Sequence, residues 1–206
     1  MIVKICGITR LEDAEAAVAA GANAVGFVFW RKSPRFVDPY NARGIVTALP
    51  PFVLPVGLFV DQPIAEVTGV ASLVRLGAVQ LHGDEPPDYA DAVGRPVIKA
   101  LLPTDVDAID RWPDRVLVLL DAIDPASRGG TGRTIDWDAA ARAARRRRVL
   151  LAGGLTPENV AEAASRVRPF GVDVSSGVER APGIKDPARM RAFFEAVHGE
   201  RTPARS

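Results

Sequence analysis

Residues that build disulfide frameworks and metal centres are scarce in this sequence. Its 206 residues include one cysteine, Cys6, and two histidines, His82 and His198. A lone cysteine excludes an internal disulfide framework and a cysteine-rich zinc site. Two histidines disfavour a histidine-based metal centre. We therefore expect a protein without a bound metal ion.

Charge of one sign and long apolar runs are also missing. The net charge is +1 at pH 7, so the overall balance favours neither nucleic acid nor a membrane surface. No apolar run reaches the ~18 residues of a spanning helix, and the start of the chain lacks the basic and apolar segments of a secretory signal. We expect a cytoplasmic protein. The basic run at 141–149 contains no interleaved aromatic residues, and we interpret it as the solvated face and last turn of a helix.

Two kinds of segment alternate along the chain. Short runs of Val, Ile, Leu and Phe are typical of buried strands, and stretches rich in Ala, Glu and Arg are typical of amphipathic helices. Strands are expected at residues 2–6, 24–30, 53–60, 78–82, 97–102, 115–121, 148–153 and 170–175. Helices are expected near residues 10–20, 38–48, 62–75, 86–93, 105–111, 136–146, 156–167 and 186–198.

Strict alternation of strands and helices implies parallel strands joined by helical crossovers. Eight such units predict an α/β fold, a single-domain (β/α)8 TIM barrel over residues 1–199 with a polar tail at 200–206. An open doubly wound sheet is the alternative. It is disfavoured because no GxGxxG turn follows the first strand.

Active sites of such barrels lie at the carboxyl ends of the strands, so the residues that close each strand are the candidates. The first strand ends in Cys6, and Lys4 lies on the same side of it. An ammonium near a thiol lowers the thiol's pKa, which would favour a reactive thiolate. Asp121 closes an apolar run, a position that disfavours the charged carboxylate and suits a general acid. Cys6 as a small buried hydrophobe and Asp121 as a turn cap are the alternatives.

The strands expected to be seventh and eighth lead into glycine-bearing loops. Gly153, Gly154 and Gly177 allow the backbone to approach a ligand closely, and helices begin nearby. The same two loops are the usual phosphate site of this barrel. We therefore predict phosphate binding here, with ordinary turns as the alternative.

Four further positions are candidates for contact with a substrate. Arg35 could hold a carboxylate in a bidentate fork, or it could be a solvated surface arginine. Gln80 and His82 share one face of a strand, and His82 could be a base or a barrel-mouth histidine without a catalytic role. Gly130 lies in RGGTG at 128–132, which lacks the ending of a nucleotide-binding P-loop and is interpreted as a mobile or phosphate-adjacent loop.

Together these motifs resemble the phosphoribosylanthranilate isomerase family of tryptophan biosynthesis. The resemblance rests on KICGIT (4–9), AVGFVF (24–29), SPRFV (33–37), VQLHGDE (79–85), LLD (119–121), GGTG (129–132), LAGGLTPENV (151–160) and DVSSGVERAPGIKD (173–186). It implies an enzyme without a cofactor that carries out the Amadori rearrangement of N-(5-phosphoribosyl)anthranilate to 1-(2-carboxyphenylamino)-1-deoxyribulose 5-phosphate.

The resemblance also implies a role for each matching residue. Cys6 would be the general base, Asp121 the general acid, and Arg35 the partner of the anthranilate carboxylate. The phosphate would be held by the loops that carry Gly153, Gly154, Ser175, Ser176 and Gly177. Further contacts with the substrate are expected from Lys4, Gln80, His82, Gly130 and Asp173.

Other readings of the same motifs remain open. The related histidine-pathway isomerase uses paired aspartates, whereas the first strand here ends in cysteine. A pentose-phosphate epimerase needs metal-ligating histidines, which are scarce here. A phosphate-binding barrel without activity would not need both Cys6 and Asp121. We expect a small-molecule substrate, no nucleic acid or membrane partner, and a monomer or homodimer.

Overall fold

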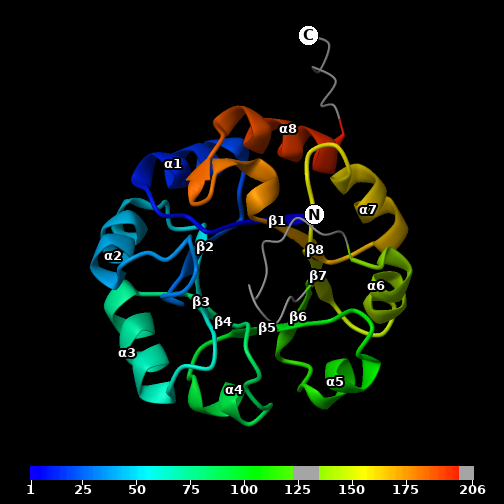
Figure 1. Ribbon diagram of the computed structural model, residues 1–206, viewed down its shortest axis with the longest axis horizontal. Coiled ribbons are helices and arrows are strands. Elements are labelled where there is room, and N and C mark those ends of the chain that lie inside the picture. The colour runs from blue at the N-terminus through cyan, green and yellow to red at the C-terminus, as the bar shows by residue number, and fades with distance from the viewer. Residues whose placement is uncertain (123–134, 200–206) are drawn as a thin grey trace.

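Residues 1–122 and 135–199 are described by the computed structural model, with the backbone alone at residues 106 and 107. Eight parallel strands hydrogen-bond in sequence order, and β8 pairs with β1 to close the barrel. The helices form a ring outside the strands (Figure 1). The predicted (β/α)8 barrel is therefore confirmed. The expected tail at 200–206 lies outside the described residues.

The barrel strands are Ile2–Cys6 (β1), Ala24–Val28 (β2), Leu54–Phe59 (β3), Ala78–Leu81 (β4), Val97–Leu101 (β5), Leu117–Leu120 (β6), Val149–Leu151 (β7) and Gly171–Val174 (β8). The helices are Leu11–Ala20 (α1), Pro39–Ala48 (α2), Ile64–Val74 (α3), Tyr89–Ala92 (α4), Val106–Arg111 (α5), Trp137–Ala144 (α6), Val160–Val167 (α7) and Pro187–His198 (α8). A 3-10 turn, Ser176–Val178 (η1), and a small hairpin, Glu179–Ala181 (β9) with Ile184–Lys185 (β10), follow β8.

Two elements differ from the expectation. The helix expected near 86–93 is the single turn α4, and the helix expected from residue 156 begins at Val160. In the second case the side chain of Asn159 accepts a hydrogen bond from Thr156 N (2.8 Å) and donates one to Gly154 O (2.9 Å). These bonds hold residues 154–159 as a turn, so the helix cannot start earlier.

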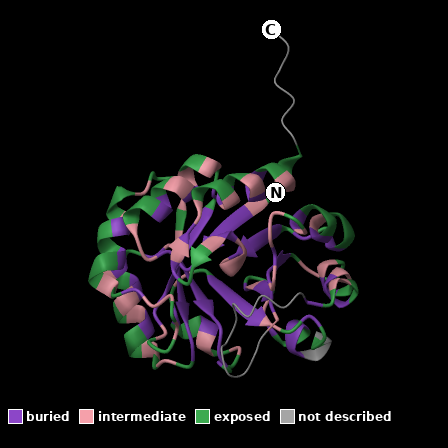
Figure 2. Ribbon diagram, turned by 45° about the horizontal axis from the view of Figure 1, so that its top comes forward, coloured by how far each residue is buried: buried purple, intermediate pink, exposed green. Residues whose placement is uncertain are grey.

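The inside of the barrel changes from apolar to polar along the strands. One apolar cluster consists of Ala24, Val56, Ala78, Ile98, Ala100, Leu119, Leu150 and Ala152. Lys4, Gln80, His82, Asp121 and Asp173 are also buried, and they lie at or near the carboxyl ends of their strands. A larger apolar layer packs between the strands and the helices, whose outer faces are exposed (Figure 2). The polar groups therefore gather at one end of an otherwise apolar core.

Strand register decides which of these groups meet. Where β8 closes on β1, Lys4 stands opposite Asp173, and on the other side of β1, Cys6 stands opposite Gly26. Side chains of directly opposed residues on neighbouring strands lie on one face and within reach of each other. The closure of the barrel thus pairs a lysine with an aspartate beside the only cysteine.

The basic run at 141–149 only partly follows the expectation of a solvated helix end. Arg145 and Arg146 are exposed, and Arg146 pairs with Asp110. Arg147 instead lies half-buried against the segment between α5 and β6. Its guanidinium donates to the carbonyl oxygens of Ile109 (2.9 Å), Trp112 (2.8 Å), Pro113 (3.0 Å) and Val116 (2.6 Å). One arginine side chain thus donates to four backbone carbonyl groups between Ile109 and Val116.

We expect Arg147→Met to lower the free energy of unfolding by about 2–3 kcal/mol, because charge-assisted hydrogen bonds are lost and carbonyls are left unpaired. Arg145→Met, which removes an exposed neighbour, should stay within about 0.5 kcal/mol of wild type. Urea unfolding of both variants measures the difference. Equal stability of the two variants would contradict this role for Arg147.

Candidate active site

A buried ion pair lies next to the cysteine at the carboxyl end of β1. Lys4 Nζ is 2.8 Å from Asp173 Oδ1, and the two side chains are 1% and 9% exposed. Burial works against the charge of Lys4, but Asp173 and Cys6 outweigh it, so the pKa of Lys4 is raised. Lys4 is therefore held as a cation.

Space for the Cys6 side chain comes from a glycine that the sequence analysis did not single out. A Cβ atom on Gly26 would lie 2.8 Å from Cys6 Sγ and 3.2 Å from Lys4 Cε. Any larger residue would push both side chains out of place. The AVGFVF segment contained this glycine, but its function depends on which residue stands opposite across the strands.

The pKa of the Cys6 thiol is raised above its ordinary value. Burial is the largest cause, and the Asp173 carboxylate acts in the same direction. Lys4 and Lys185 favour the thiolate but do not outweigh them. The expectation that Lys4 lowers the pKa of the thiol is confirmed, but its effect is smaller than the opposing effects, so the net pKa of Cys6 is still raised. The physical reason is that Lys4 already has a carboxylate partner, Asp173, and that Cys6 is only 5% exposed.

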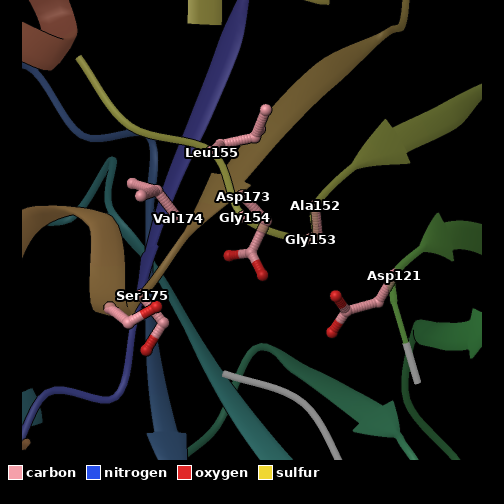
Figure 3. Close-up of a pocket in the computed structure, with 9 residues that line it drawn as sticks. Asp121, Ala152, Gly153, Gly154, Leu155, Asp173, Val174 and Ser175 are labelled. Carbon is pink, nitrogen blue, oxygen red and sulfur yellow. The ribbon is translucent and has the colours of Figure 1, made fainter. Parts of the chain in front are cut away.

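Asp121 projects into the pocket at the mouth of the barrel from the end of β6. The pocket is lined by Asp121, Ala152, Gly153, Gly154, Leu155, Asp173, Val174, Ser175 and Ser176. Figure 3 shows the carboxylates of Asp121 and Asp173 projecting into it. Asp121 and the predicted phosphate loops thus surround one space. Cys6 is not among the residues that line it, but it lies within the electrostatic reach of Asp173, which does.

A second polar pair stands on the β4 side of Asp121. Gln80 Nε2 lies 3.0 Å from His82 Nδ1, and His82 Nε2 lies 3.5 Å from Asp121 Oδ2. If the Gln80 amide donates to Nδ1, a neutral imidazole carries its proton on Nε2. Among the described residues, this Nε2 is buried and has no hydrogen-bond partner. Asp121 Oδ1 accepts from the N–H of Ala122 (2.7 Å). His82 therefore orients towards Asp121.

The loops after β7 and β8 lie directly against each other. A Cβ atom on Gly177 would lie 1.9 Å from the carbonyl oxygen of Leu155, so only glycine permits this approach. The backbone N–H groups of Gly153, Gly154 and Ser176 have no hydrogen-bond partner among the described residues. Free N–H groups converging from two loops suit an anion such as a phosphate.

Arg35 is partly buried and has a carboxylate partner in this chain, Glu179. Its Nε and Nη2 donate to Glu179 Oε1 (2.9 Å) and Oε2 (2.7 Å). The alternative of a solvated arginine is wrong, because the side chain is 12% exposed. To reach Glu179, the Arg35 side chain crosses the backbone at Gly7. A Cβ atom on Gly7 would lie 2.6 Å from Arg35 Cδ.

Glu179 and Lys185, which the sequence pattern did not indicate, face each other across the β9–β10 hairpin. Lys185 Nζ donates to Glu179 Oε1 (2.7 Å) and to the carbonyl oxygen of Ser175 (3.2 Å). Burial lowers the pKa of Lys185 against the opposing effect of Glu179. Burial would raise the pKa of Glu179, but Arg35 and Lys185 reverse this and lower it. Both residues lie in DVSSGVERAPGIKD, where a glutamate and a lysine six residues apart gave no sign of contact.

Gly130, the remaining predicted contact, lies outside the described residues. Within residues 1–122 and 135–199, no three His, Cys, Asp or Glu side chains form a group that could hold a metal ion. Among the same residues, no helix is both long and apolar enough to cross a membrane. The expectation that the protein needs no cofactor stays a prediction.

Several known proteins are similar to this chain in sequence and in fold. Residues 3–196 match the family model described as N-(5'phosphoribosyl)anthranilate (PRA) isomerase. The chain belongs to this family. It is 55% identical over 199 residues to the N-(5'-phosphoribosyl)anthranilate isomerase of Geobacter sulfurreducens, with 96% of this chain and 98% of that protein covered.

Two solved members of the PRA isomerase family are similar throughout. The phosphoribosyl anthranilate isomerase of Thermus thermophilus is 45% identical with a TM-score of 0.89, covering 98% of this chain and 100% of that chain. A phosphoribosyl anthranilate isomerase in complex with reduced 1-(o-carboxyphenylamino)-1-deoxyribulose 5-phosphate is 44% identical with a TM-score of 0.85, covering 97% and 100%.

Replacing either partner of the Lys4–Asp173 pair should move the pKa of the Cys6 thiol in opposite directions. Lys4→Met removes a cation that favours the thiolate, so the thiol pKa should rise further. Asp173→Asn removes an anion that disfavours the thiolate, so the thiol pKa should fall. Because the chain has one cysteine, the pH dependence of its thiolate ultraviolet absorbance reports Cys6 alone.

Cys6→Ser supplies the background absorbance for this titration. Shifts of the same sign in both variants would contradict the electrostatic interpretation, because general loosening of the site would move both towards the ordinary thiol pKa.

Proposed function

We propose that this chain catalyses the Amadori rearrangement of N-(5-phosphoribosyl)anthranilate to 1-(2-carboxyphenylamino)-1-deoxyribulose 5-phosphate, as a phosphoribosylanthranilate isomerase of tryptophan biosynthesis. The observation that carries the proposal is the arrangement at the barrel mouth. A thiol at the end of β1 and a carboxyl group at the end of β6 flank two loops whose residues Gly153, Gly154 and Ser176 line one pocket. This arrangement offers a base, an acid and a phosphate site to one small substrate.

In this proposal Asp121 acts first, as the general acid. It gives its proton to the ribose ring oxygen, the bond between that oxygen and the anomeric carbon breaks, and an iminium ion forms on the anthranilate nitrogen. Asp121 is left as a carboxylate. His82, whose Nε2 faces Asp121 Oδ2 at 3.5 Å, is placed to donate towards that new charge.

Cys6 acts second, as the general base. Its thiolate takes the proton from C2′, and the electrons of that C–H bond form the double bond of an enolamine as the iminium is neutralised. The enolamine then tautomerises to the ketone of the product. Cys6 ends as a thiol and Asp121 as a carboxylate, so one proton must return to Asp121 before the next turnover.

The reactive form of the enzyme thus carries a proton on Asp121 and none on Cys6. Burial disfavours this form, as the raised pKa of Cys6 shows. The charges around the sulfur partly offset that cost. Lys4 and Lys185 both favour the thiolate, although they do not outweigh burial and Asp173.

The assay mixes the purified protein with freshly made phosphoribosylanthranilate and follows the loss of anthranilate fluorescence. Wild type should turn over, and Cys6→Ser and Asp121→Asn should each lose about 10²–10⁴-fold in kcat, the range typical for removal of one acid or base. A wild-type protein that binds a sugar phosphate but leaves this substrate unchanged would contradict the proposal and favour another phosphosugar barrel or a non-catalytic one.

Gly177→Ala tests the proposed phosphate site. The added methyl group cannot fit against the Leu155 carbonyl, so the two loops must separate and their N–H groups must diverge. We expect KM to rise by about tenfold or more, equivalent to about 1.4 kcal/mol of binding. Gly69→Ala, in α3 with open space around the added group, is the matched control and should leave KM unchanged. An unchanged KM in Gly177→Ala would place the phosphate elsewhere.

A cytoplasmic location and a monomeric or homodimeric state remain predictions that accompany this function.

A further inference from the structure

Arg35 has two edges with which it can hold a carboxylate, and this chain uses one of them. A guanidinium carries five N–H donors: one on Nε and two on each terminal nitrogen. Glu179 takes the inner edge, formed by Nε and Nη2, at 2.9 and 2.7 Å. Nη1 has no hydrogen-bond partner among the described residues. The outer edge, formed by Nη1 and the second N–H of Nη2, is therefore open for a second planar anion.

Glu179 is held too firmly to leave when such an anion arrives. Its Oε1 also accepts from Lys185 Nζ (2.7 Å) and from the N–H of Gly183 (3.3 Å), and its side chain is 4% exposed. Lys185 is itself fully buried. Moving Glu179 away would leave a buried ammonium without its counter-charge, which is costly.

The open edge belongs to a side chain that is placed close to the proposed base. Arg35 crosses the backbone at Gly7, the residue directly after Cys6. Lys185 also donates to the carbonyl oxygen of Ser175, in the loop that lines the pocket. One hairpin therefore fixes Arg35 relative to both the cysteine and the proposed phosphate loop.

We propose that Glu179, anchored by Lys185, is a positioning residue that holds the inner edge of Arg35 so that the outer edge binds the carboxylate of the substrate's aromatic ring. This rests on the proposed function. One guanidinium would then be shared by two carboxylates, one permanent and one brought by the substrate. The recognition of a carboxylate-bearing aromatic amine would depend on Glu179, although Glu179 does not touch the substrate.

A blocking role for Glu179 makes the opposite prediction. If Glu179 had to leave Arg35 before the substrate carboxylate could bind, Glu179→Gln would weaken the competing interaction and lower KM. If Glu179 positions Arg35, the same change removes one charge-assisted bond of the fork, lets the guanidinium rotate, and raises KM. The sign of the change therefore distinguishes the two.

The experiment compares steady-state kinetics of wild type, Glu179→Gln, Arg35→Met and the double variant with phosphoribosylanthranilate. We expect KM of Glu179→Gln to rise about 10- to 100-fold, by analogy with the loss seen when the partner that orients a metal ligand is removed. Its kcat should change less than about threefold, because Cys6 and Asp121 are untouched. In the Arg35→Met background, Glu179→Gln should add no further rise in KM, because there is no guanidinium left to orient.

Two controls separate this effect from a general loss of structure. Asp138→Asn removes the carboxylate partner of another arginine, Arg166, on the outer helices at 2.8 Å, and should leave KM unchanged. Glu179→Gln combined with Lys185→Met removes both buried charges together, so it folds even if the single variant leaves Lys185 too costly to bury. This variant should show the same rise in KM.

The outcomes also separate this proposal from the function on which it depends. A wild type that does not convert phosphoribosylanthranilate overturns the proposed function. A wild type that converts it, together with an unchanged or lowered KM in Glu179→Gln and in the double-charge variant, overturns the positioning role alone. A further rise in KM from Glu179→Gln in the Arg35→Met background would also overturn it, because Glu179 would then act independently of Arg35.

Discussion

The buried ion pair between Lys4 and Asp173 is the interaction on which the site depends. It exists because β8 closes the barrel on β1 with these two residues opposite each other. Such a pair adds little to stability compared with apolar residues of similar size, yet losing one partner leaves a buried charge and costs about 3–5 kcal/mol. The fold therefore keeps both charges, the Lys4 ammonium and the Asp173 carboxylate, fixed beside Cys6.

These charges explain how a deeply buried thiol can serve as a base at all. Burial and Asp173 raise the pKa of Cys6, whereas Lys4 and Lys185 act against them. The second ion pair, between Lys185 and Glu179, comes from the hairpin after β8 and brings Arg35 into the same cluster. Lys4 and Lys185, from opposite sides of the site in sequence, thus both favour the thiolate that the proposed chemistry needs.

Local pattern predicted most of the architecture. The alternation of apolar runs with amphipathic stretches determined the barrel, and the period of two along a strand placed Lys4 and Cys6 on one side. The rule that parallel strands present their carboxyl ends together pointed to Asp121 and to the glycine loops. Each of these inferences needs only neighbouring residues in the chain.

The sequence pattern could not identify ion-pair partners that are far apart in the chain. Asp173 is 169 residues from Lys4, and Glu179 is 144 residues from Arg35. Periodicity tells which face a side chain occupies but not which residue stands opposite after closure. The direction of the Cys6 pKa shift was missed for a related reason. The shift results from burial and from three charges, Lys4, Asp173 and Lys185. Only Lys4 could be linked to Cys6 from the strand pattern.

Kinetic isotope effects with substrate deuterated at C2′ test the assignment of base and acid most directly. If Cys6 removes that proton, Cys6→Ser should slow this step and enlarge the primary isotope effect on kcat. If Asp121 opens the ring, Asp121→Asn should make the earlier step limiting and suppress the isotope effect. The opposite pattern, with a suppressed effect in Cys6→Ser and an enlarged one in Asp121→Asn, would contradict both roles.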